Sequence, residues 1–418
     1  MFSIHSKLCL SMLILGLSFS SLSAAEAAPE STSPAVKTLT PPPPAPPVLK
    51  PYEDPYRDGL YSTIVTMIQL GGPEPKKQKE FKLQIPKAKA KVLVKAIIQD
   101  QPAPLVVVLV GVDGKAADPL GLYWPYVLDK YAKYNVLWFD STFRPGYADT
   151  TRFGVTGNFP AEAEQASQLI AEFLKLPDVK GKITQIGVLG YSMGGTQAML
   201  MGQMAADKKL PFELAGAVAF SPPVSLKRTA ELLDEFYNKD RWKYTMADMA
   251  KTFMTHTPIA PGGKIPFEPD FMRAAIGFLV RDEFTQIVER NDSIFRLKLI
   301  PDEDADGAAV NRVSMAEAWG FVRFMEKMSF PYWKQKGAVK TVDDLWDGCT
   351  LSHILKNNPP NTHAVIAADD PLNSPEDLDA LQKSVDPKIL TVLPNGGHLG
   401  FMGSYWSFYQ VKQMFGDK

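Results

Sequence analysis

Short runs of Val, Ile and Leu alternate along the chain with longer amphipathic stretches. The runs that predict strands are Val92 to Ile98, Leu105 to Val110, Val136 to Phe139, Ile183 to Leu189, Ala215 to Phe220, Ala364 to Ala367 and Ile389 to Leu393. Several are continuously apolar, which is typical of strands covered on both faces in a mostly parallel sheet. The stretches that predict helices between them are Trp124 to Lys133, Ala161 to Leu176 and Thr196 to Ala206. Alternating strands and helices indicate an α/β fold with flanking helices around a central sheet.

The alternation stops between Phe220 and His363. The segment 221–362 is mainly helix-like, and its amphipathic stretches are Leu226 to Tyr237, Tyr244 to Phe253 and Met315 to Met328. This segment is too long for a plain connection between neighbouring strands. We therefore expect a helical lid inserted after the sixth strand, which divides the core into residues 52–220 and 363–418.

The first 25 residues have the pattern of an export signal. Lys7 precedes an apolar stretch from Leu8 to Phe19, and Ser23-Ala24-Ala25 is a small-x-small cleavage pattern. A membrane-anchoring helix is the alternative, but the stretch is shorter than the roughly 20 residues that span a bilayer. We expect cleavage after Ala25, no transmembrane span afterwards, and a periplasmic or secreted protein.

Residues 26–51 are rich in Ala, Ser, Thr and Pro and end in PPPPAPPVLKP, from Pro41 to Pro51. Such a sequence favours an extended polyproline II conformation over helix or sheet. We expect a passive spacer between the export signal and the body of the protein. Recognition of this segment by a proline-binding partner is the alternative.

Composition narrows the classes of function. The chain has 418 residues, of which 45% are hydrophobic, so it can bury a large core. Its 45 Lys and Arg residues are balanced by 46 Asp and Glu residues, which leaves no basic excess for a nucleic acid partner. The two cysteines, Cys9 and Cys349, cannot supply a disulfide framework or a Cys-rich zinc site.

The strongest chemical signal is IGVLGYSMGG, from Ile186 to Gly195. An apolar strand runs into the G-x-S-x-G motif Gly190–Gly194 and then into a predicted helix, a context typical of a nucleophile elbow. The turn presents the serine hydroxyl, and the N-terminus of the following helix favours developing negative charge. We predict that Ser192 is a nucleophile, with a structural glycine-rich turn as the alternative.

A nucleophilic serine needs a general base, and four histidines follow the export signal: His256, His353, His363 and His398. The first two lie in the helical segment, and His363 begins a predicted strand. His398 lies in LPNGGHLGFMG, a glycine-rich loop directly after the last predicted strand. Such a loop can return an imidazole over the strand ends without steric conflict. We predict His398 as the base, with a plain turn histidine as the alternative.

The base needs a carboxylate that orients its ring. The strand that ends at Ala367 is followed by Ala368-Asp369-Asp370-Pro371-Leu372. Asp370 is the better candidate because it stands directly before the short segment that leads into the next helix. Asp369 remains the alternative.

An oxyanion hole completes such a site. Its first donor is expected to be the backbone N–H of Met193, the residue after the nucleophile. The second is expected to come from the loop that follows Leu105 to Val110, where we choose the N–H of Val112.

Several of these segments resemble the YheT-like esterase branch of the α/β-hydrolases. They are VVVLVGVDG (Val106–Gly114), GYSMGG, FSPPVSLKRTAELLD (Phe220–Asp234), AADDPL (Ala367–Leu372) and GGHLGFMG (Gly396–Gly403). The resemblance covers the chain from about Tyr52 onward and implies an α/β-hydrolase fold. It also implies a serine esterase or lipase whose Ser, Asp and His map onto Ser192, Asp370 and His398. Two features depart from the branch: Val110-Gly111 replaces the usual His-Gly, and the helical insertion is longer.

Three weaker sequence features each have a structural interpretation as well as a functional one. Residues Asp302 to Gly307 match the first half of a calcium loop, but position 12 is Val313 instead of Glu, which favours a solvated acidic loop. Eight lysines between Lys76 and Lys95 favour protection of a sheet edge, with association with an anionic envelope surface as the alternative. Cys349 is expected to be a buried packing thiol.

Together these features predict an exported serine hydrolase that cleaves a small-molecule or lipid-like ester. The reaction would pass through an acyl-enzyme on Ser192 and would need no metal or organic cofactor. Two alternatives stay open. One is a peptidase or amidase on the same fold, because a triad does not distinguish esters from amides. The other is a non-catalytic envelope protein that keeps the fold for binding.

Overall fold

A central sheet organises the part of the chain that the structure describes. The structure is a computed structural model, and it describes residues 51–112, 114–240, 243, 244, 249, 252, 265, 267–303 and 309–416. The sheet has eight strands in the order β1-β2-β4-β3-β5-β6-β7-β8. Their bounds are β1 Lys79–Leu83, β2 Val92–Ile97, β3 Ala103–Leu109, β4 Asn135–Phe139, β5 Ile183–Tyr191, β6 Gly216–Phe220, β7 Thr362–Ala367 and β8 Leu390–Leu393.

The sheet is mostly parallel, as predicted. β1 and β2 form an antiparallel pair and β2 runs antiparallel to β4, whereas β4, β3, β5, β6, β7 and β8 are parallel to their neighbours. The seven predicted strands correspond to β2 through β8. β1 was not predicted, because its sequence Lys-Glu-Phe-Lys-Leu is largely polar and the strand lies at the edge of the sheet with mostly exposed side chains.

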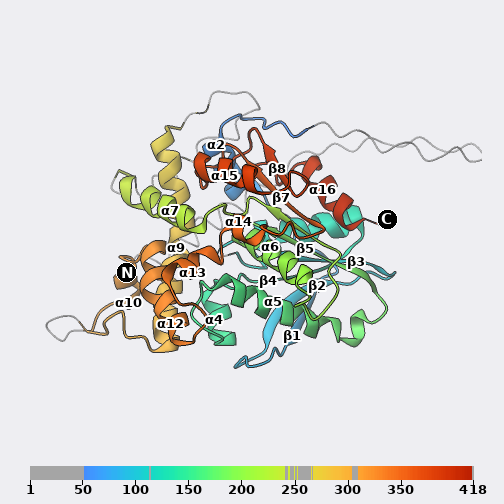
Figure 1. The fold of residues 1–418 in the computed structure, drawn as a ribbon, viewed down its shortest axis with the longest axis horizontal. Helices are drawn as coiled ribbons and strands as arrows, with labels where there is room; N and C mark the ends of the chain where they lie inside the picture. Colours follow the sequence, from blue (N-terminus) through green and yellow to red (C-terminus); the bar gives the residue numbers. More distant parts are fainter. Residues whose placement is uncertain are drawn as a thin grey trace, which may run out of the picture. The chain divides into compact units, whose positions relative to one another are not determined.

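Helices cover both faces of the sheet (Figure 1). The flanking helices are α2 Gly59–Gln69, α3 Pro119–Val127, α4 Pro145–Thr151, α5 Phe159–Leu174, α6 Met193–Ala206, α15 Pro375–Ser384 and α16 Tyr405–Phe415. Val106 and Val108 of β3 belong to the same buried cluster as Trp124 of α3. The intervening residue Val107 belongs to the cluster on the other face, with Phe159 of α5. Because alternate residues of a strand are buried on opposite faces of the sheet, a continuously apolar sequence correctly predicted these core strands.

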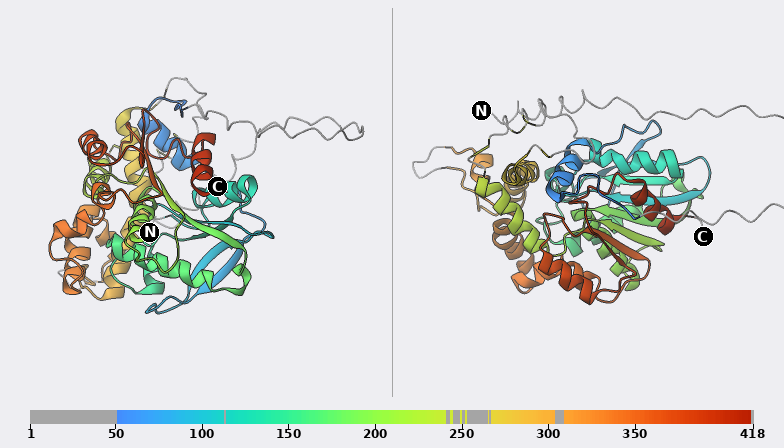
Figure 2. Two further views of the ribbon diagram at one scale, coloured as in Figure 1. Left: turned by 45° about the vertical axis from the view of Figure 1, so that its right-hand side comes forward. Right: turned by 90° about the horizontal axis from the view of Figure 1, so that it is seen from above.

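The long segment between β6 and β7 is helical. Its helices are α7 Leu226–Asp240, α9 Pro269–Phe295, α10 Arg312–Ala316, α11 Phe321–Phe324, α12 Phe330–Gln335, α13 Val342–Asp347 and α14 Leu351–Ile354, and a π-helical turn, Met325–Ser329, joins α11 to α12. Figure 2 shows these helices gathered to one side of the sheet. We call this segment the insertion. The predicted stretch Tyr244 to Phe253 lies largely outside the described residues.

The predicted helix from Met315 to Met328 is not continuous. α10 ends at Ala316, and α11 starts only after Gly320. The break is held by the carboxylate of Asp234 in α7, which accepts hydrogen bonds from the backbone N–H groups of Phe321 and Val322 at 2.8 and 3.1 Å. The amphipathic pattern therefore located the buried face but not the interruption, which depends on a carboxylate from another helix.

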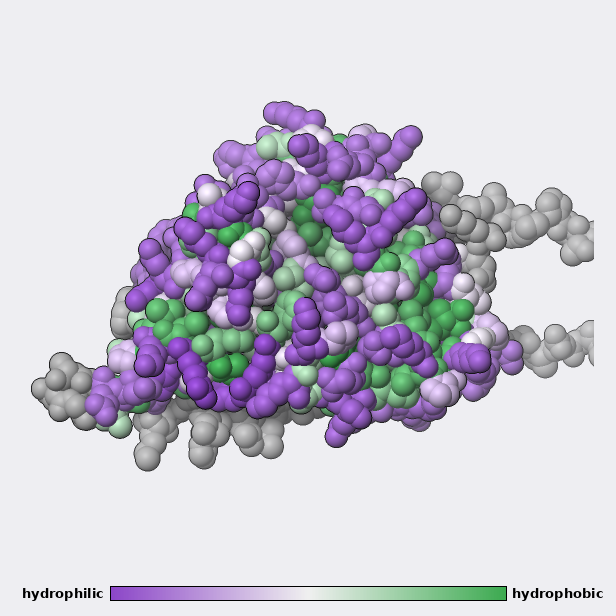
Figure 3. Space-filling model, turned by 60° about the horizontal axis from the view of Figure 1, so that its bottom comes forward, coloured by the Kyte–Doolittle hydropathy of each residue, from purple (hydrophilic) through white to green (hydrophobic). Residues whose placement is uncertain are grey.

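Hydrophilic side chains dominate the face of the molecule shown in Figure 3, and the hydrophobic ones gather in separate patches. Large hydrophobic side chains that are exposed among the described residues number six: Leu93, Tyr131, Leu299, Val313, Met315 and Tyr405. In the same part of the chain, no helix combines the length and the apolar character needed to span a bilayer.

Candidate active site

Ser192 stands on a sharp turn between β5, which ends at Tyr191, and α6, which begins at Met193. Its backbone has φ 53° and ψ −129°, a conformation that side chains disfavour and that is associated with functional sites. Its N–H donates to the carbonyl oxygen of Phe220 in β6 at 2.8 Å, which anchors the turn to the sheet. A Cβ at Gly190 would clash with the carbonyl of Gly194, so the turn requires glycine at this position.

Three predicted residues meet at this turn. The Nε2 atom of His398 lies 2.9 Å from the Oγ of Ser192, and its Nδ1 lies 2.9 Å from the Oδ2 of Asp370. His398 and Asp370 are buried, and the second carboxylate oxygen of Asp370 accepts the N–H of Leu372 at 2.9 Å. With the proton of the ring on Nδ1 and donated to Asp370, Nε2 is free to accept the hydroxyl proton of Ser192.

Asp369 has a different contact from its neighbour. Its Oδ1 accepts the backbone N–H of Gly397 at 2.8 Å, and its carboxylate does not meet the imidazole. Burial raises the pKa of the Asp369 carboxyl, and the nearby charge of Asp54 adds to this effect, while the N–H of Gly397 opposes it. Of the two adjacent aspartates, the structure therefore brings only Asp370 to the ring of His398.

The expected oxyanion donors lie around the nucleophile. Met193 is the first residue of α6, so its N–H has no acceptor within the helix. A Cβ added at Gly111 would lie 3.6 Å from the Oγ of Ser192, which places the backbone directly before Val112 beside the nucleophile. Val110, which replaces the expected histidine, is buried in the cluster that contains Trp124.

The remaining histidines lie elsewhere. His363 in β7 is hydrogen bonded through its ring nitrogens to the carbonyl oxygen of Lys388 and to the hydroxyl of Thr391, and burial lowers its pKa. His353 is exposed next to Asp347. His256 lies outside the described residues.

Two residues that hold the His398 loop were not predicted. The N–H of His398 donates to the Oγ1 of Thr63 at 2.8 Å, and the N–H of Leu399 donates to the Oγ of Ser221 at 3.1 Å. Ser221 directly follows β6, where a polar residue at a strand end could have been noticed. Nothing in the local sequence of Thr63 points to a histidine 335 positions away.

Metal-binding groups of three or more His, Cys, Asp or Glu side chains are absent from the described residues. The candidate calcium loop falls partly outside them, at residues 304–308. Its first residue, Asp302, is ion-paired with Arg312 at 2.5 Å. Cys349 is fully buried, and burial raises the pKa of its thiol far above the usual range.

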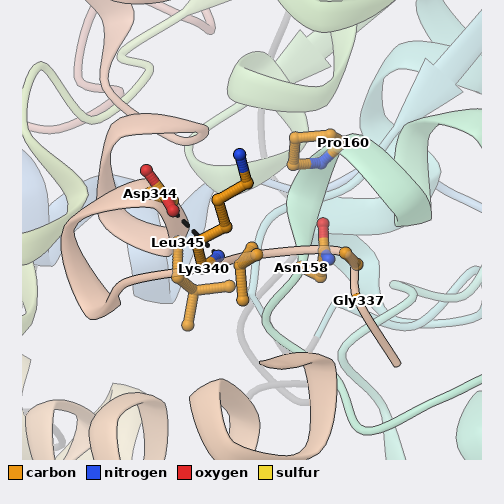
Figure 4. A pocket seen from close by; sticks show the side chains of 8 residues that line it. Asn158, Pro160, Gly337, Lys340, Asp344 and Leu345 are labelled. Carbon is orange, nitrogen blue, oxygen red and sulfur yellow. Dashed lines mark hydrogen bonds between the residues drawn. The ribbon is translucent and has the colours of Figure 1, made fainter. Parts of the chain in front are cut away.

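A cavity of about 350 Å³ lies away from these residues, between the start of α5 and the stretch before α13 (Figure 4). Asn158 and Pro160 line one side, and residues 337–340 with Asp344 and Leu345 line the other. The carboxylate of Asp344 accepts the backbone N–H groups of Lys340 and Thr341, both at 2.8 Å, and the bond from Thr341 is part of the capping box of α13. None of the candidate catalytic residues lines this cavity.

A family comparison agrees with the fold. The model of the alpha/beta hydrolase family matches residues 106–405, which is more than half of the chain. The chain belongs to the alpha/beta hydrolase family. The predicted fold class is thereby confirmed, while the YheT-like branch within the family stays a prediction. None of the curated proteins matches the sequence.

Solved structures with a similar fold include several esterases. The carboxylesterase CesB of Bacillus subtilis is 12% identical, with 85% of this chain and 96% of that chain covered and a TM-score of 0.44. The naproxen esterase of Bacillus subtilis is 16% identical, with 85% and 97% covered and a TM-score of 0.41. A hyperthermophilic esterase of the archaeon Pyrobaculum calidifontis is 14% identical, with 85% and 87% covered and a TM-score of 0.42.

Proposed function

We propose that this alpha/beta hydrolase is an exported serine hydrolase that cleaves carboxylic esters through an acyl-enzyme on Ser192. The observation that carries the proposal is the continuous chain of hydrogen bonds Ser192–His398–Asp370, with both heavy-atom distances at 2.9 Å, at a strained strand-to-helix turn. A serine hydroxyl is a weak nucleophile until a base takes its proton, and this geometry supplies the base and its orienting carboxylate.

In the acylation half of the cycle, the Oγ of Ser192 attacks the ester carbonyl while its proton passes to Nε2 of His398. The carbonyl oxygen gains negative charge, which the N–H groups of Met193 and Val112 would stabilise. The tetrahedral intermediate then collapses: the C–O bond to the alcohol breaks, and the alcohol leaves with the proton from His398. Asp370 stabilises the imidazolium that exists between these two proton transfers.

In the deacylation half, water replaces the alcohol. His398 takes a proton from water, the hydroxide adds to the acyl carbon, and the bond to the Oγ of Ser192 breaks. The serine regains its proton from the imidazolium and the carboxylic acid is released. Every atom in this cycle comes from the ester, water and the three side chains.

The insertion and the N-terminal segment complete the proposal. The insertion would act as a lid over a small-molecule or lipid-like ester. Residues 1–25 would direct export to the periplasm or the outside of the cell and be removed, and 26–51 would remain as a spacer. Lys77, Lys79 and Lys95 each pair with a carboxylate, which supports the edge-protecting role of the lysine cluster over attachment to the envelope.

The test of catalysis is hydrolysis of p-nitrophenyl esters of increasing acyl length by the mature protein and by Ser192→Ala. We expect activity in the wild type and its loss in the variant, and the preferred chain length would measure the acyl pocket. A fluorophosphonate probe should label only the wild type at this serine. Wild-type protein that is neither active nor labelled would overturn the proposal and favour a binding function, whereas labelling with activity on amides alone would favour a peptidase.

The test of export is separate. The full-length chain is expressed in a bacterium, the cell fractions are separated, and the N-terminus of the mature protein is sequenced. We expect a periplasmic or extracellular protein that begins at Glu26. A cytoplasmic protein that keeps residues 1–25 would contradict export without affecting the catalytic proposal.

A further inference from the structure

Helix α2 lies against the two loops that bring the acid and the base to Ser192. In Figure 1 it lies next to the red segments that follow β7 and β8. A Cβ at Gly59 would clash with the carbonyl oxygen of Asp369, and a Cβ at Gly397 would clash with the carbonyl oxygen of Gly59. The first turn of α2 is therefore in direct backbone contact with both loops.

Thr63 is the point at which α2 touches the histidine itself. Its side chain is fully buried, and its Oγ1 accepts the N–H of His398 at 2.8 Å. The same hydroxyl donates to the carbonyl oxygen of Gly59 at 2.6 Å. This second bond fixes the rotation of the hydroxyl, so that a lone pair points at the His398 N–H.

The backbone around His398 needs such an anchor. Gly397 and Leu399, on either side of it, have φ values of 56° and 70°, so the histidine lies between two left-handed residues. A left-handed leucine is strained and persists only where the surroundings hold it. Here three consecutive backbone N–H groups, those of residues 397–399, donate hydrogen bonds to the side chains of Asp369, Thr63 and Ser221 respectively.

We propose that Thr63 is a positioning residue for His398. Its hydroxyl fixes the backbone of the catalytic loop so that the imidazole spans the 2.9 Å distances to both Ser192 and Asp370. Without it the His398 N–H would be buried with no acceptor, which favours a rearranged loop. Displacements of about 1 Å at a reacting group can reduce a rate about 100-fold. This inference rests on the proposed function, since it assigns His398 as the base.

The test compares Thr63→Val, which keeps the shape and removes the hydroxyl, with Thr63→Ser, which keeps both hydrogen bonds. Thr66→Val is the matched control, because it makes the same chemical change three residues further along α2. For Thr63→Val we expect kcat to fall about 10- to 100-fold with little change in KM. Thr63→Ser should recover most of that loss, and Thr66→Val should resemble the wild type.

Proton NMR tests the position of His398 without depending on enzymatic turnover. The proton between Nδ1 of His398 and Asp370 should give a far-downfield proton NMR signal in the wild type, and Thr63→Val should shift or broaden it while circular dichroism stays unchanged. The inference is overturned if Thr63→Val keeps its kcat and this signal, or if Thr63→Ser is impaired as strongly as Thr63→Val. A wild type without Ser192-dependent turnover or labelling would instead be a failure of the proposed function, and the NMR signal would still decide the role of Thr63.

Discussion

The neighbouring aspartates Asp369 and Asp370 have different hydrogen-bond partners and therefore different roles. Asp370 gives one oxygen to the ring of His398 and the other to the N–H of Leu372. Asp369 accepts the N–H of Gly397 with one oxygen, and its buried Oδ2 has no hydrogen-bond partner among the described residues. The first carboxylate is placed to stabilise an imidazolium, and the second to hold a loop.

Asparagine at each position should separate these roles. Asp370→Asn keeps the shape but removes the charge and the acceptor for Nδ1–H, so we expect kcat to fall on the order of 10³- to 10⁴-fold. Asp369→Asn can still accept the Gly397 N–H and should cost far less. Steady-state hydrolysis by the two variants measures the difference. Equal losses would contradict the assignment of Asp370 as the orienting acid.

Glu162 in α5 is a buried carboxyl next to α6, the helix that follows Ser192. Its oxygens accept hydrogen bonds from the hydroxyl of Thr142 and the N–H of Gly157, both at 2.6 Å, and from the side chain of Gln197 in α6 at 3.2 Å. Burial raises the pKa of Glu162, and these three hydrogen bonds oppose the rise without cancelling it.

The raised pKa predicts a definite pH dependence of stability. In the unfolded chain the pKa of the Glu162 carboxyl is about 4.3. Above this pH, the folded protein holds a proton on Glu162 that the unfolded chain has lost. This group therefore lowers the free energy of unfolding as pH rises, until the folded pKa is passed. Glu162→Gln removes this ionisable group and its effect on stability. Denaturant titrations between pH 4 and pH 8 should show the free energy of unfolding of the variant rising relative to that of the wild type as pH increases. A difference between the two that is independent of pH, or that changes in the opposite direction, would contradict the raised pKa of Glu162.

Among the elements, a buried ion pair ties the insertion together. Arg281 of α9 donates to Asp234 of α7 at 2.7 Å, and the guanidinium also reaches the carbonyl oxygens of Glu317 and Trp319. The arginine side chain is 3% exposed. Asp234 in turn receives the first N–H groups of α11, so one carboxylate joins three helices.

Removal of this carboxylate should destabilise the protein strongly. Asp234→Ala removes the carboxylate that pairs with the buried Arg281 and accepts the first N–H groups of α11, and we expect a loss of about 3–5 kcal/mol in the free energy of unfolding. The matched control is Arg228→Ala, which breaks the exposed pair with Glu231 on the same helix and should cost less than about 1 kcal/mol. Thermal and urea unfolding of both variants give the comparison. Similar small losses would show that the pair does not hold the insertion.

The elements also show where sequence reasoning succeeds. β2 through β8 were predictable because burial on both faces demands continuous Val, Ile and Leu. Helix α2 was not predicted, since Ser-Thr-Ile-Val-Thr at 62–66 is rich in β-branched residues that favour strands. It is helical because Asp58 accepts the N–H of Tyr61 at 2.9 Å and because Tyr61 and Ile64 are buried in the core. Packing from distant parts of the chain outweighs the local preference.

Some residues of the candidate site could likewise be predicted from the sequence and others could not. Ser192 and His398 were predictable because glycine motifs mark the tight turns that carry them. The sequence favoured Asp370 over Asp369 by its position before the next helix, and in the structure Asp370 is the aspartate that contacts the ring of His398. Thr63 and Gly59 could not be found, since their roles arise where segments remote in sequence touch. A sequence pattern locates the candidate catalytic residues more readily than the residues that hold them.

At the scale of the whole molecule, residues 52–418 form one unit by their contacts. Helix α2 stands at the start of the larger unit and contributes to its core through Tyr61 and Ile64. It also packs against the insertion, where Tyr61 lies 6.0 Å from the ring of Phe267. The boundary of the unit therefore falls before α2.

Two truncations test this boundary. Removal of residues 1–51 leaves the contacts of the larger unit intact, and we expect wild-type kcat and melting temperature. Removal of residues 1–70 deletes α2, so we expect loss of activity together with a lower melting temperature. Enzyme assays and calorimetry of both truncated proteins provide the check. Full activity without α2 would show that the His398 loop holds its shape alone.

The bond between Thr63 and His398 joins residues 335 positions apart, and a ribosome makes them in that order. During synthesis Thr63 is made long before His398, so the hydrogen bond between them can form only after the segment that carries His398 exists. Contacts between residues so far apart in sequence slow folding, because the entropy of closing the intervening loop must be lost before they form. A truncated or half-folded chain would carry Ser192 without a seated base. Under the proposed function, hydrolysis would therefore require the segment that carries His398 to be made and folded onto helix α2.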